Sequence, residues 1–356
     1  MNVETPDVVV VGLGPAGSRA AAAASAAGFD VTAIDRRKQA GTPVQCAEFV
    51  PVMIERDVPD LHVATRQPVR RMLTQAEHER PEETPNFPGH IIDRAIFDRM
   101  LAQQAARAGA TCLFGTSLER IDPDGTLWLS DGSVCCPRLV IGADGPRSRV
   151  GAAIGRVNRE IVETRQVTVP LTFPHDATDI FLRADYRGGY GWLFPKGALA
   201  NIGIGVSIEQ RQCLKPLLAA LHAGLSGARR VGTRASALTG GAIPVGGRLN
   251  AVGRLGRTAV LLAGDASGLT NPVTGAGIAA AVQSGTLAGR AAAEWLGGRA
   301  GALDEYEEEL GDVFDAALAR AHRRRRGVLA TYERGARPDV EALRAGWIAS
   351  PHYWAA

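Results

Sequence analysis

The stretch DVVVVGLGPAGSRAAAAASAAGFDVTAID occupies residues 7–35 and decides the fold. An apolar run, Val8–Val11, leads into a Gly12-x-Gly14-x-x-Gly17 turn, an alanine-rich segment and a second apolar run. This order predicts a strand, a tight turn, a helix and a second strand, which is the βαβ unit that binds dinucleotides. Asp35 closes the second strand, where its carboxylate can accept hydrogen bonds from a ribose diol, and Arg36 follows it.

Each residue of the turn has a physical role in such a unit. Gly12 permits the sharp exit from the strand, Gly14 lets the backbone approach a pyrophosphate, and Gly17 allows the helix to pack on the strand. Pro15, followed by Ala16, suits the first helical turn, because the N–H that proline lacks has no helical partner there. The helix N-terminus then offers free N–H groups and a positive dipole end to the phosphates.

The composition is that of an ordinary globular protein, with room for one large domain or two interleaved ones in 356 residues. A net charge of +3 is too small to favour nucleic-acid binding. The cysteines are odd in number and have no CxxC spacing, which indicates reduced thiols in a cytoplasmic protein. They are Cys46, Cys112, Cys135, Cys136 and Cys213.

No stretch is long and apolar enough to predict a transmembrane span, and the N-terminus lacks the basic region of a signal peptide. The seven histidines form no HxH or HExxH cluster, and we expect no metal site. There is also no GxSxG motif of a serine hydrolase.

Further elements follow from apolar spacing and turn residues. A loop over residues 36–51 and a polar, proline-rich region precede Gly89, with an exposed loop over residues 78–83. Residues 93–107 carry apolar side chains at helical spacing behind Asp93, a suitable N-cap. Asp131-Gly132 predicts a hairpin turn. Residues 139–141 form a short buried strand that ends in the sequence Gly-Ala-Asp-Gly, residues 142–145.

Between residues 160 and 256 strand patterns dominate, over residues 166–173, 180–185, 190–194 and 199–207. Ile202, Ile204 and Val206 alternate on one face of the last strand, so Gly203 and Gly205 leave the other face bare. A bare strand face indicates close approach of a backbone or a ligand, and a bulge or a sheet twist is an equal alternative.

The C-terminal third returns to α/β character. A buried strand over residues 259–263 precedes Gly264-Asp265, and a glycine-rich turn opens a helix that reaches Leu296. A further helix is predicted over residues 303–325, with the basic run Arg323–Arg326 at its end. That run is either a solvated face or a contact for an anionic lipid or a phosphate.

The Gly-x-Gly-x-x-Gly turn, the later Gly-Ala-Asp-Gly segment and Gly264-Asp265 together resemble the flavoprotein hydroxylase superfamily, similar to p-hydroxybenzoate hydroxylase, over nearly the whole chain. The resemblance implies an FAD that lies extended across a Rossmann-like domain. The implied FAD contacts are Gly12, Gly14, Pro15, Ala16, Gly17, Asp35, Arg36, Arg94, Asp144, Gly145, Gly264, Asp265, Pro272, Thr274, Gly275, Ala276 and Gly277.

These residues also suit the cofactor chemically. Asp265 closes an apolar strand, where its carboxylate can accept hydrogen bonds from ribityl hydroxyls. Pro272–Gly277 bring a helix N-terminus to the flavin edge, where the helix dipole favours negative charge on the reduced ring. The resemblance assigns Arg94 to the cofactor as well, with a surface salt bridge as the alternative.

Within that superfamily, two stretches resemble the geranylgeranyl reductase family: residues 190–205, which begin YGWLFPKG, and residues 264–278, GDASGLTNPVTGAGI. The resemblance implies a cavity over the flavin that is lined by Tyr190 and Trp192. Phe194, Gly203 and Gly205 lie on the same strands and complete the predicted substrate face. A plain hydrophobic core suits the aromatic pair equally well.

The loop after the second strand departs from that family. The family has a cysteine followed by small glycines there, whereas this chain has Cys46-Ala47-Glu48-Phe49. We therefore take Cys46 and Glu48 as candidate catalytic residues. A carboxylate beside a flavin can orient a polar or aromatic substrate or act as a base.

The predicted fold class is α/β: a Rossmann-like FAD-binding domain with an interleaved antiparallel β-sheet substrate domain and C-terminal helices. The FAD-binding domain is expected over residues 1–60, 90–158 and 256–300, the substrate domain over 61–89 and 159–255, and a helical segment over 301–356. The chain has no second glycine-rich motif after a later strand. We therefore expect NAD(P)H or another protein to bind transiently as reductant.

The predicted function is an FAD-dependent oxidoreductase with a hydrophobic or aromatic substrate. It is either a monooxygenase or hydroxylase, with an aromatic or peptidyl substrate, or a double-bond reductase with a lipid one. A flavin-binding maturation or partner protein without turnover is the third alternative. The expected location is the cytoplasm, with peripheral membrane contact as an addition.

Overall fold

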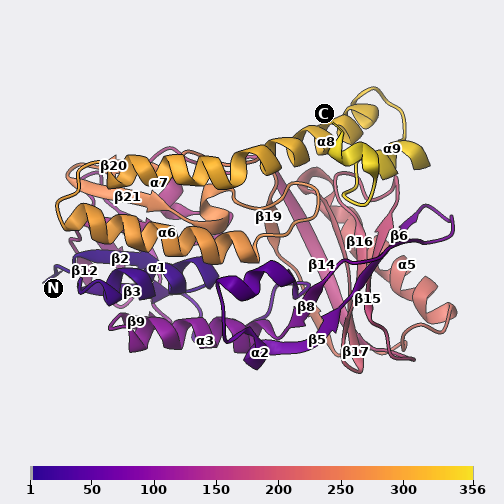
Figure 1. Cartoon of the computed structure of the whole chain (residues 1–356), viewed down its shortest axis with the longest axis horizontal. Helices are drawn as coiled ribbons and strands as arrows, with labels where there is room; N and C mark the ends of the chain where they lie inside the picture. The colour runs from indigo at the N-terminus through magenta and orange to yellow at the C-terminus, as the bar shows by residue number, and fades with distance from the viewer. Residues whose placement is uncertain (1–2, 356) are drawn as a thin grey trace.

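The computed structural model describes residues 3–355 and shows an elongated molecule with a sheet at each end (Figure 1). The first sheet has six strands in the order β20-β21-β13-β2-β3-β9. All neighbouring pairs are parallel except the edge pair β20–β21. The strands are β2 (Val8–Val11), β3 (Val31–Asp35), β9 (Thr111–Phe114), β13 (Leu139–Gly142), β20 (Val252–Leu255) and β21 (Thr258–Leu262).

The predicted βαβ unit is present at the centre of this sheet. Helix α1 (Pro15–Ala26) joins β2 to β3, and every residue of β2 is buried. Such continuous burial is typical of a parallel sheet that is covered on both faces. Helices α3 (Arg94–Arg107) and α6 (Ile278–Leu296) lie beside α1 on one face (Figure 1).

Helices α1 and α6 pack backbone against backbone. A Cβ added to Gly285 would lie 2.1 Å from the carbonyl oxygen of Ala16, and one added to Gly289 would lie 2.4 Å from that of Ala20. No side chain fits in either space, so the glycines and alanines of these helices determine how closely the two helices approach.

A small four-stranded sheet packs its apolar side chains into the core of the six-stranded sheet. It consists of β1 (Val3–Glu4), β10 (Leu118–Ile121), β11 (Leu127–Leu129) and β12 (Val134–Cys135). The hairpin predicted at Asp131-Gly132 joins β11 to β12. On α3, the predicted N-cap is confirmed, because the Asp93 carboxylate accepts hydrogen bonds from the N–H groups of Ala95 and Ile96.

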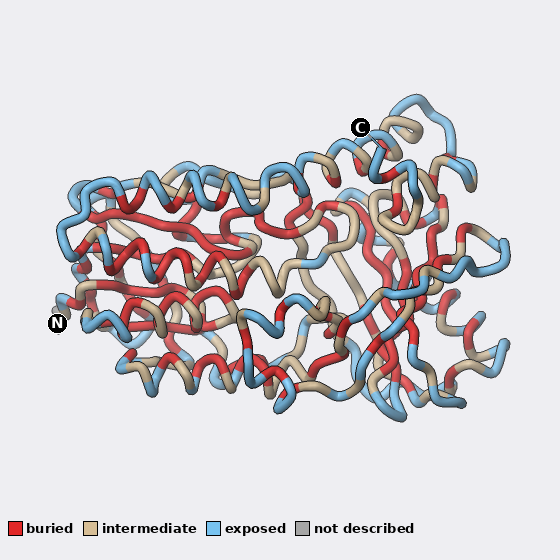
Figure 2. Tube along the Cα trace, in the orientation of Figure 1, coloured by how far each residue is buried: buried red, intermediate tan, exposed pale blue. Residues whose placement is uncertain are grey.

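The second large sheet has eight strands, in the order β18-β14-β17-β16-β15-β6-β7, with β19 also paired to β14. Its members are β6 (Arg71–Ala76), β7 (Glu82–Thr84), β14 (Ile161–Pro170), β15 (Ala177–Leu182), β16 (Gly191–Lys196), β17 (Leu199–Ser207), β18 (Ala237–Thr239) and β19 (Ala242–Pro244). Ile202, Ile204 and Val206 of β17 pack against helix α5 (Leu214–Gly227), as their alternation predicts. The buried strands form the interior in Figure 2.

The polar region before Gly89 contains more structure than its composition suggests. It holds a 3₁₀ turn (Val52–Arg56), a short helix α2 (Leu61–Ala64) and β5 (Thr65–Val69) as well as β6 and β7. Strand β7 also begins inside the stretch that we expected to be a loop. Strand β5 joins β4 (Phe49–Pro51) and β8 (Gly89–Ile92) in a three-stranded sheet between the two large ones.

The C-terminal helices run from the first large sheet to the second (Figure 1). Helix α7 (Ala302–Leu310) continues through a π-helical turn (Gly311–Asp315) into α8 (Ala316–Glu333), and α9 (Val340–Ala345) and α10 (Pro351–Trp354) follow. The helix therefore extends past the predicted end at residue 325, and the basic run lies inside α8 rather than at a helix end. Arg325 is buried and donates hydrogen bonds to the Gly188 carbonyl and the Ser207 hydroxyl.

Candidate active site

The glycines of the first turn occupy two different environments. A Cβ on Gly12 would lie 2.3 Å from the Ala143 carbonyl oxygen, and one on Gly17 would lie 1.7 Å from that of Gly12. These two glycines allow the turn to close. A Cβ on Gly14 would meet no atom within 4 Å, so the first turn of α1 faces open space there. A pyrophosphate fits this arrangement, because Gly14 leaves the helix N-terminus accessible.

Asp35 supports the same turn. Its carboxylate accepts hydrogen bonds from the backbone N–H groups of Leu13, at 2.9 Å, and Arg37, at 2.7 Å. Arg36, predicted beside the ribose, has an exposed side chain. The contact of Asp35 with a ribose stays a prediction, as does that of Arg36.

Two further carboxylates predicted at the cofactor, Asp144 and Asp265, are half-buried. Burial raises the pKa of Asp265, whose Oδ1 accepts a hydrogen bond from the Thr270 hydroxyl at 2.8 Å. Burial also raises the pKa of Asp144, and hydrogen bonds from Ser148 and the Arg149 N–H oppose the effect. Each carboxylate follows the carboxyl end of a parallel strand, which is where α/β sheets bind ligands.

The turn before α6 is organised by Asn271, a residue to which the sequence analysis gave no role. Its side-chain oxygen accepts hydrogen bonds from the N–H groups of Val273 and Thr274, both at 3.0 Å, and its N–H donates to Ala276. Gly277 is the N-cap of α6 and has no side chain to cover the free N–H groups. This geometry suits a helix end that faces an electron-rich ring.

Arg94 is the first residue of α3, and its side chain is partly buried, with 16% of its surface exposed. Its contact with the cofactor stays a prediction. Its guanidinium forms an ion pair with the buried Asp98, at 2.9 and 3.0 Å. Burial alone would lower the pKa of Arg94. The nearby Asp98 and Cys46 raise it by more, so the pKa of Arg94 lies above its ordinary value. Arg94 is thus a fixed cation beside the loop that carries Cys46.

The predicted substrate face is densely packed. Trp192 has 6 % of its surface exposed and lies in an apolar cluster with Met72, Ile180 and Phe194. Its indole N–H donates to Gln166 at 3.0 Å. Tyr190 donates its hydroxyl to the Thr274 carbonyl at 2.6 Å, and so joins this face to the turn before α6.

The two strand glycines have different neighbours. A Cβ on Gly203 would lie 2.1 Å from the indole of Trp192, so this glycine makes room for that ring. A Cβ on Gly205 would lie 3.0 Å from Val162. Trp347, from the segment after α9, covers the face further, with its ring 4.9 Å from that of Tyr190. The sequence analysis gave Trp347 no role, and no motif marks it.

Glu48 is buried, with 2 % of its surface exposed, and both of its carboxylate oxygens accept hydrogen bonds. Lys196 donates at 2.7 and 2.8 Å, Asn201 at 2.9 Å and the N–H of Arg94 at 3.0 Å. Lys196 and Asn201 are further residues to which the sequence analysis gave no role. The only sequence signal was a lysine that closes an apolar strand.

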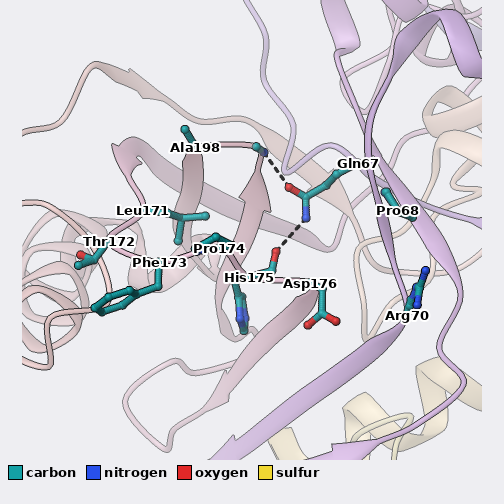
Figure 3. A pocket seen from close by; sticks show the side chains of 11 residues that line it. Gln67, Pro68, Arg70, Leu171, Thr172, Phe173, Pro174, His175, Asp176 and Ala198 are labelled. Atoms are coloured by element: carbon teal, nitrogen blue, oxygen red, sulfur yellow. Dashed lines mark hydrogen bonds between the residues drawn. The ribbon is translucent and has the colours of Figure 1, made fainter.

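A cavity of about 610 Å³ lies at the far end of the second sheet, where Gln67 of β5 bridges the Gly197 N–H and the His175 carbonyl (Figure 3). Its lining, all within the described part of the chain, includes none of the predicted cofactor or substrate residues. A second cavity, of about 480 Å³, lies beside Arg248, which is paired with Glu307 and Asp315. Over residues 3–355 no helix is long and apolar enough to cross a membrane, and no cluster of potential metal ligands occurs.

Comparison with known proteins agrees with this geometry. Residues 5–189, more than half of the chain, match the FAD binding domain family. The protein is therefore an FAD-dependent oxidoreductase by class, and Gly14, the α1 N-terminus and the half-buried carboxylates fit that cofactor.

Relatives of known function narrow the class. Digeranylgeranylglycerophospholipid reductase 2 of Methanopyrus kandleri is 35% identical over 342 residues, which cover 88% of this chain and 85% of that protein. The reductase of Methanocaldococcus jannaschii is 30% identical, over 85% of this chain and 79% of that protein. The chain belongs to the geranylgeranyl reductase family of flavoproteins.

Solved structures confirm the predicted α/β fold. A geranylgeranyl bacteriochlorophyll reductase-like protein from Thermoplasma acidophilum matches with a TM-score of 0.83 and 27% identity, over 98% of this chain and 92% of that one. PqsL of P. aeruginosa, in complex with 2-aminobenzoylacetate, has a TM-score of 0.74 at 19% identity, over 96% of this chain and 98% of that one. The second likeness shows the fold alone.

Proposed function

We propose that this protein reduces carbon–carbon double bonds in the isoprenoid chains of a lipid. The observation that carries the proposal is 35% identity to a digeranylgeranylglycerophospholipid reductase over 88% of the chain. When bound and reduced by NAD(P)H or a reduced protein, FAD would supply the hydride equivalent for one alkene carbon, and a proton would complete the saturation at the other.

The chain's own residues hold and orient both partners in this proposal. Gly14 and the α1 N-terminus bind the pyrophosphate, Asp35 the ribose, and Asp265 and the turn before α6 the flavin half of the cofactor. Tyr190, Trp192 and Phe194 provide an aromatic wall that suits an apolar chain. The hydrogen bond from Tyr190 to the Thr274 carbonyl supports this placement, because it ties the wall to the turn assigned to the flavin edge.

The domain division proposed from the sequence fits these roles. The six-stranded sheet draws its strands from the segments assigned to FAD, except the edge strand β20 (Val252–Leu255), which lies in the segment assigned to the substrate. The eight-stranded sheet draws all of its strands from the segments assigned to the substrate. Cys46 lies in the loop between the two sheets, and we assign the loop, rather than its thiol, to the reaction.

The test is anaerobic incubation of the FAD-loaded protein with digeranylgeranylglycerophospholipid and either NADPH, NADH or dithionite. We expect the lipid to gain two hydrogens for each double bond reduced, as mass spectrometry detects. Product formation with dithionite alone would identify the electron donor as a separate protein. A product that forms only in a parallel aerobic incubation and gains an oxygen atom would show a monooxygenase and refute the proposal.

A further inference from the structure

Glu48 has a backbone conformation that is unusual for its residue type. Its φ is +73°, in the left-handed region that glycine adopts readily and other residues adopt seldom. The side chain is buried at the same time, although burial of a carboxylate is costly unless it is paired and hydrogen-bonded. A residue that combines both features is held in place by its surroundings.

Three separate elements hold it. Lys196 comes from the end of β16, Asn201 from β17, and the Arg94 N–H from the start of α3. Asn201 is itself fixed, because its side-chain oxygen accepts a hydrogen bond from the Thr168 hydroxyl of β14 at 2.8 Å. The carboxylate therefore ties the Cys46 loop to the second sheet and to a helix of the first.

We propose that Glu48 is a positioning residue: its carboxylate, bound by Lys196 and Asn201, fixes the Cys46 loop against the substrate sheet and so determines where that loop lies beside the flavin. The loop has a second attachment to the substrate sheet at Cys46, two residues before Glu48. Gln166 of β14 donates to the Cys46 carbonyl at 3.1 Å and accepts from the Trp192 indole. Strand β16, which carries Trp192 of the proposed substrate wall, is thus linked to the same loop through Gln166.

The Cys46 thiol reports on the position of the loop. Its sulfur accepts a hydrogen bond from the Glu48 N–H at 3.2 Å. Burial raises the pKa of Cys46, and the nearby Arg94 opposes that effect without cancelling it. Thiolates rather than thiols react with alkylating reagents, so the thiol is slow to react while the loop is in place. A loop that has come loose exposes Cys46 and makes it reactive.

A base role for Glu48 makes a different prediction. A general base needs a free lone pair in reach of the substrate proton. Each oxygen of Glu48 already accepts two hydrogen bonds, from Lys196 and either Asn201 or the Arg94 N–H. The carboxylate therefore has no free lone pair for a substrate proton. Loss of a base would remove one limb of the pH–rate profile and leave the reactivity of Cys46 unchanged.

The experiment measures the alkylation of each cysteine by iodoacetamide at pH 8, with peptide mapping by mass spectrometry and Cys136, which is exposed, as the internal reference. The main variant is Glu48→Gly with Lys196→Met. Glycine adopts the positive φ without strain, and removal of both charges leaves no unpaired ion in the interior. We expect Cys46 to react about tenfold faster or more, with bound FAD retained and its visible absorption bands shifted.

The matched control is Asp179→Asn with Arg230→Met, which removes another partly buried ion pair of the same sheet. Cys46 should react at the wild-type rate in that variant. If the main variant does not fold, the alkylation rate of Cys46 is measured in Glu48→Gln instead, because glutamine keeps the shape of the side chain and removes only the charge.

An unchanged Cys46 rate in the folded Glu48 variant, or an equal increase in the control, would overturn the inference. The inference rests on the FAD site of the proposed function and not on its substrate. Alkylation needs no substrate, so the rate at Cys46 still tests the role of Glu48 if the lipid-reduction assay fails.

Discussion

The glycine turn after β2 and strand β17 both depend on glycine, but the atoms that require the glycine differ. In the six-stranded sheet, Gly12 and Gly17 lie against backbone carbonyls of the adjoining turns. In the eight-stranded sheet, Gly203 lies against the indole ring of Trp192. A carbonyl of the main chain is present whatever the side chains are, whereas the indole is present only because residue 192 is tryptophan.

This difference explains why the cofactor side is more readily predicted from sequence than the substrate side. Glycines imposed by the backbone recur in a fixed local pattern, and the pattern itself can be recognised. Glycines imposed by one partner side chain have no fixed pattern. Substitutions on the two sheets should therefore fail in different ways, and three predictions compare them.

The largest expected effect is on the substrate sheet. Trp192→Ala should lower the free energy of unfolding by about 3–5 kcal/mol, because it leaves a cavity in an apolar cluster. Denaturant titration measures the change. Trp354→Ala, at a tryptophan that is 60% exposed, should cost less than about 1 kcal/mol. Wild-type stability in the Trp192 variant would show a loosely held ring that borders an open cavity.

The next effect is on the cofactor sheet and leaves folding intact. Gly14→Val should weaken FAD binding about 100-fold or more, roughly 2.7 kcal/mol, because its side chain would occupy the open space before α1. Titration of the apoprotein with FAD gives the affinity, and the free energy of unfolding of the apoprotein should not change. Gly224→Val, at a helical glycine that also faces open space, is the control and should bind FAD normally.

The smallest effect concerns the charge of Asp265. Burial raises its pKa in the folded protein, so the contribution of Asp265 to stability is largest at low pH and is lost as pH rises through the raised pKa. Asp265→Asn removes this loss, and its melting temperature relative to wild type should increase from pH 4 to pH 7. FAD binding should weaken about tenfold through a lost charged hydrogen bond.

Asp124→Asn is the control of opposite sign. Hydrogen bonds from Thr126 lower the pKa of Asp124, so this variant should lose stability relative to wild type as pH rises. Parallel pH profiles for the Asp265 variant and wild type would mean that the carboxyl is solvated in the folded protein.

Local patterns predicted much of the fold. The βαβ unit, the Asp93 N-cap and the bounds of β17 all follow from residues that are close in sequence. Strand β6 was missed because its longer pairing is with β15, more than 100 residues later, and its other partner, β7, is a short polar strand. Likewise, Lys196 and Asn201 meet Glu48 across 148 and 153 residues, a proximity that only the folded loop creates.

The close contact of α1 with α6 has a mechanical consequence. Gly285 and Gly289 let the backbones of the two helices meet without an intervening side chain at these positions, so we expect the helices to move as one rigid body. The N-terminus of α1 is assigned to the pyrophosphate, and the turn before α6 to the flavin edge. The span between these two contacts is thus constant, and motion of the substrate sheet can admit a ligand without stretching the cofactor. Amide hydrogen exchange should show α1 and α6 opening together, at a higher free energy than the strands of the second sheet.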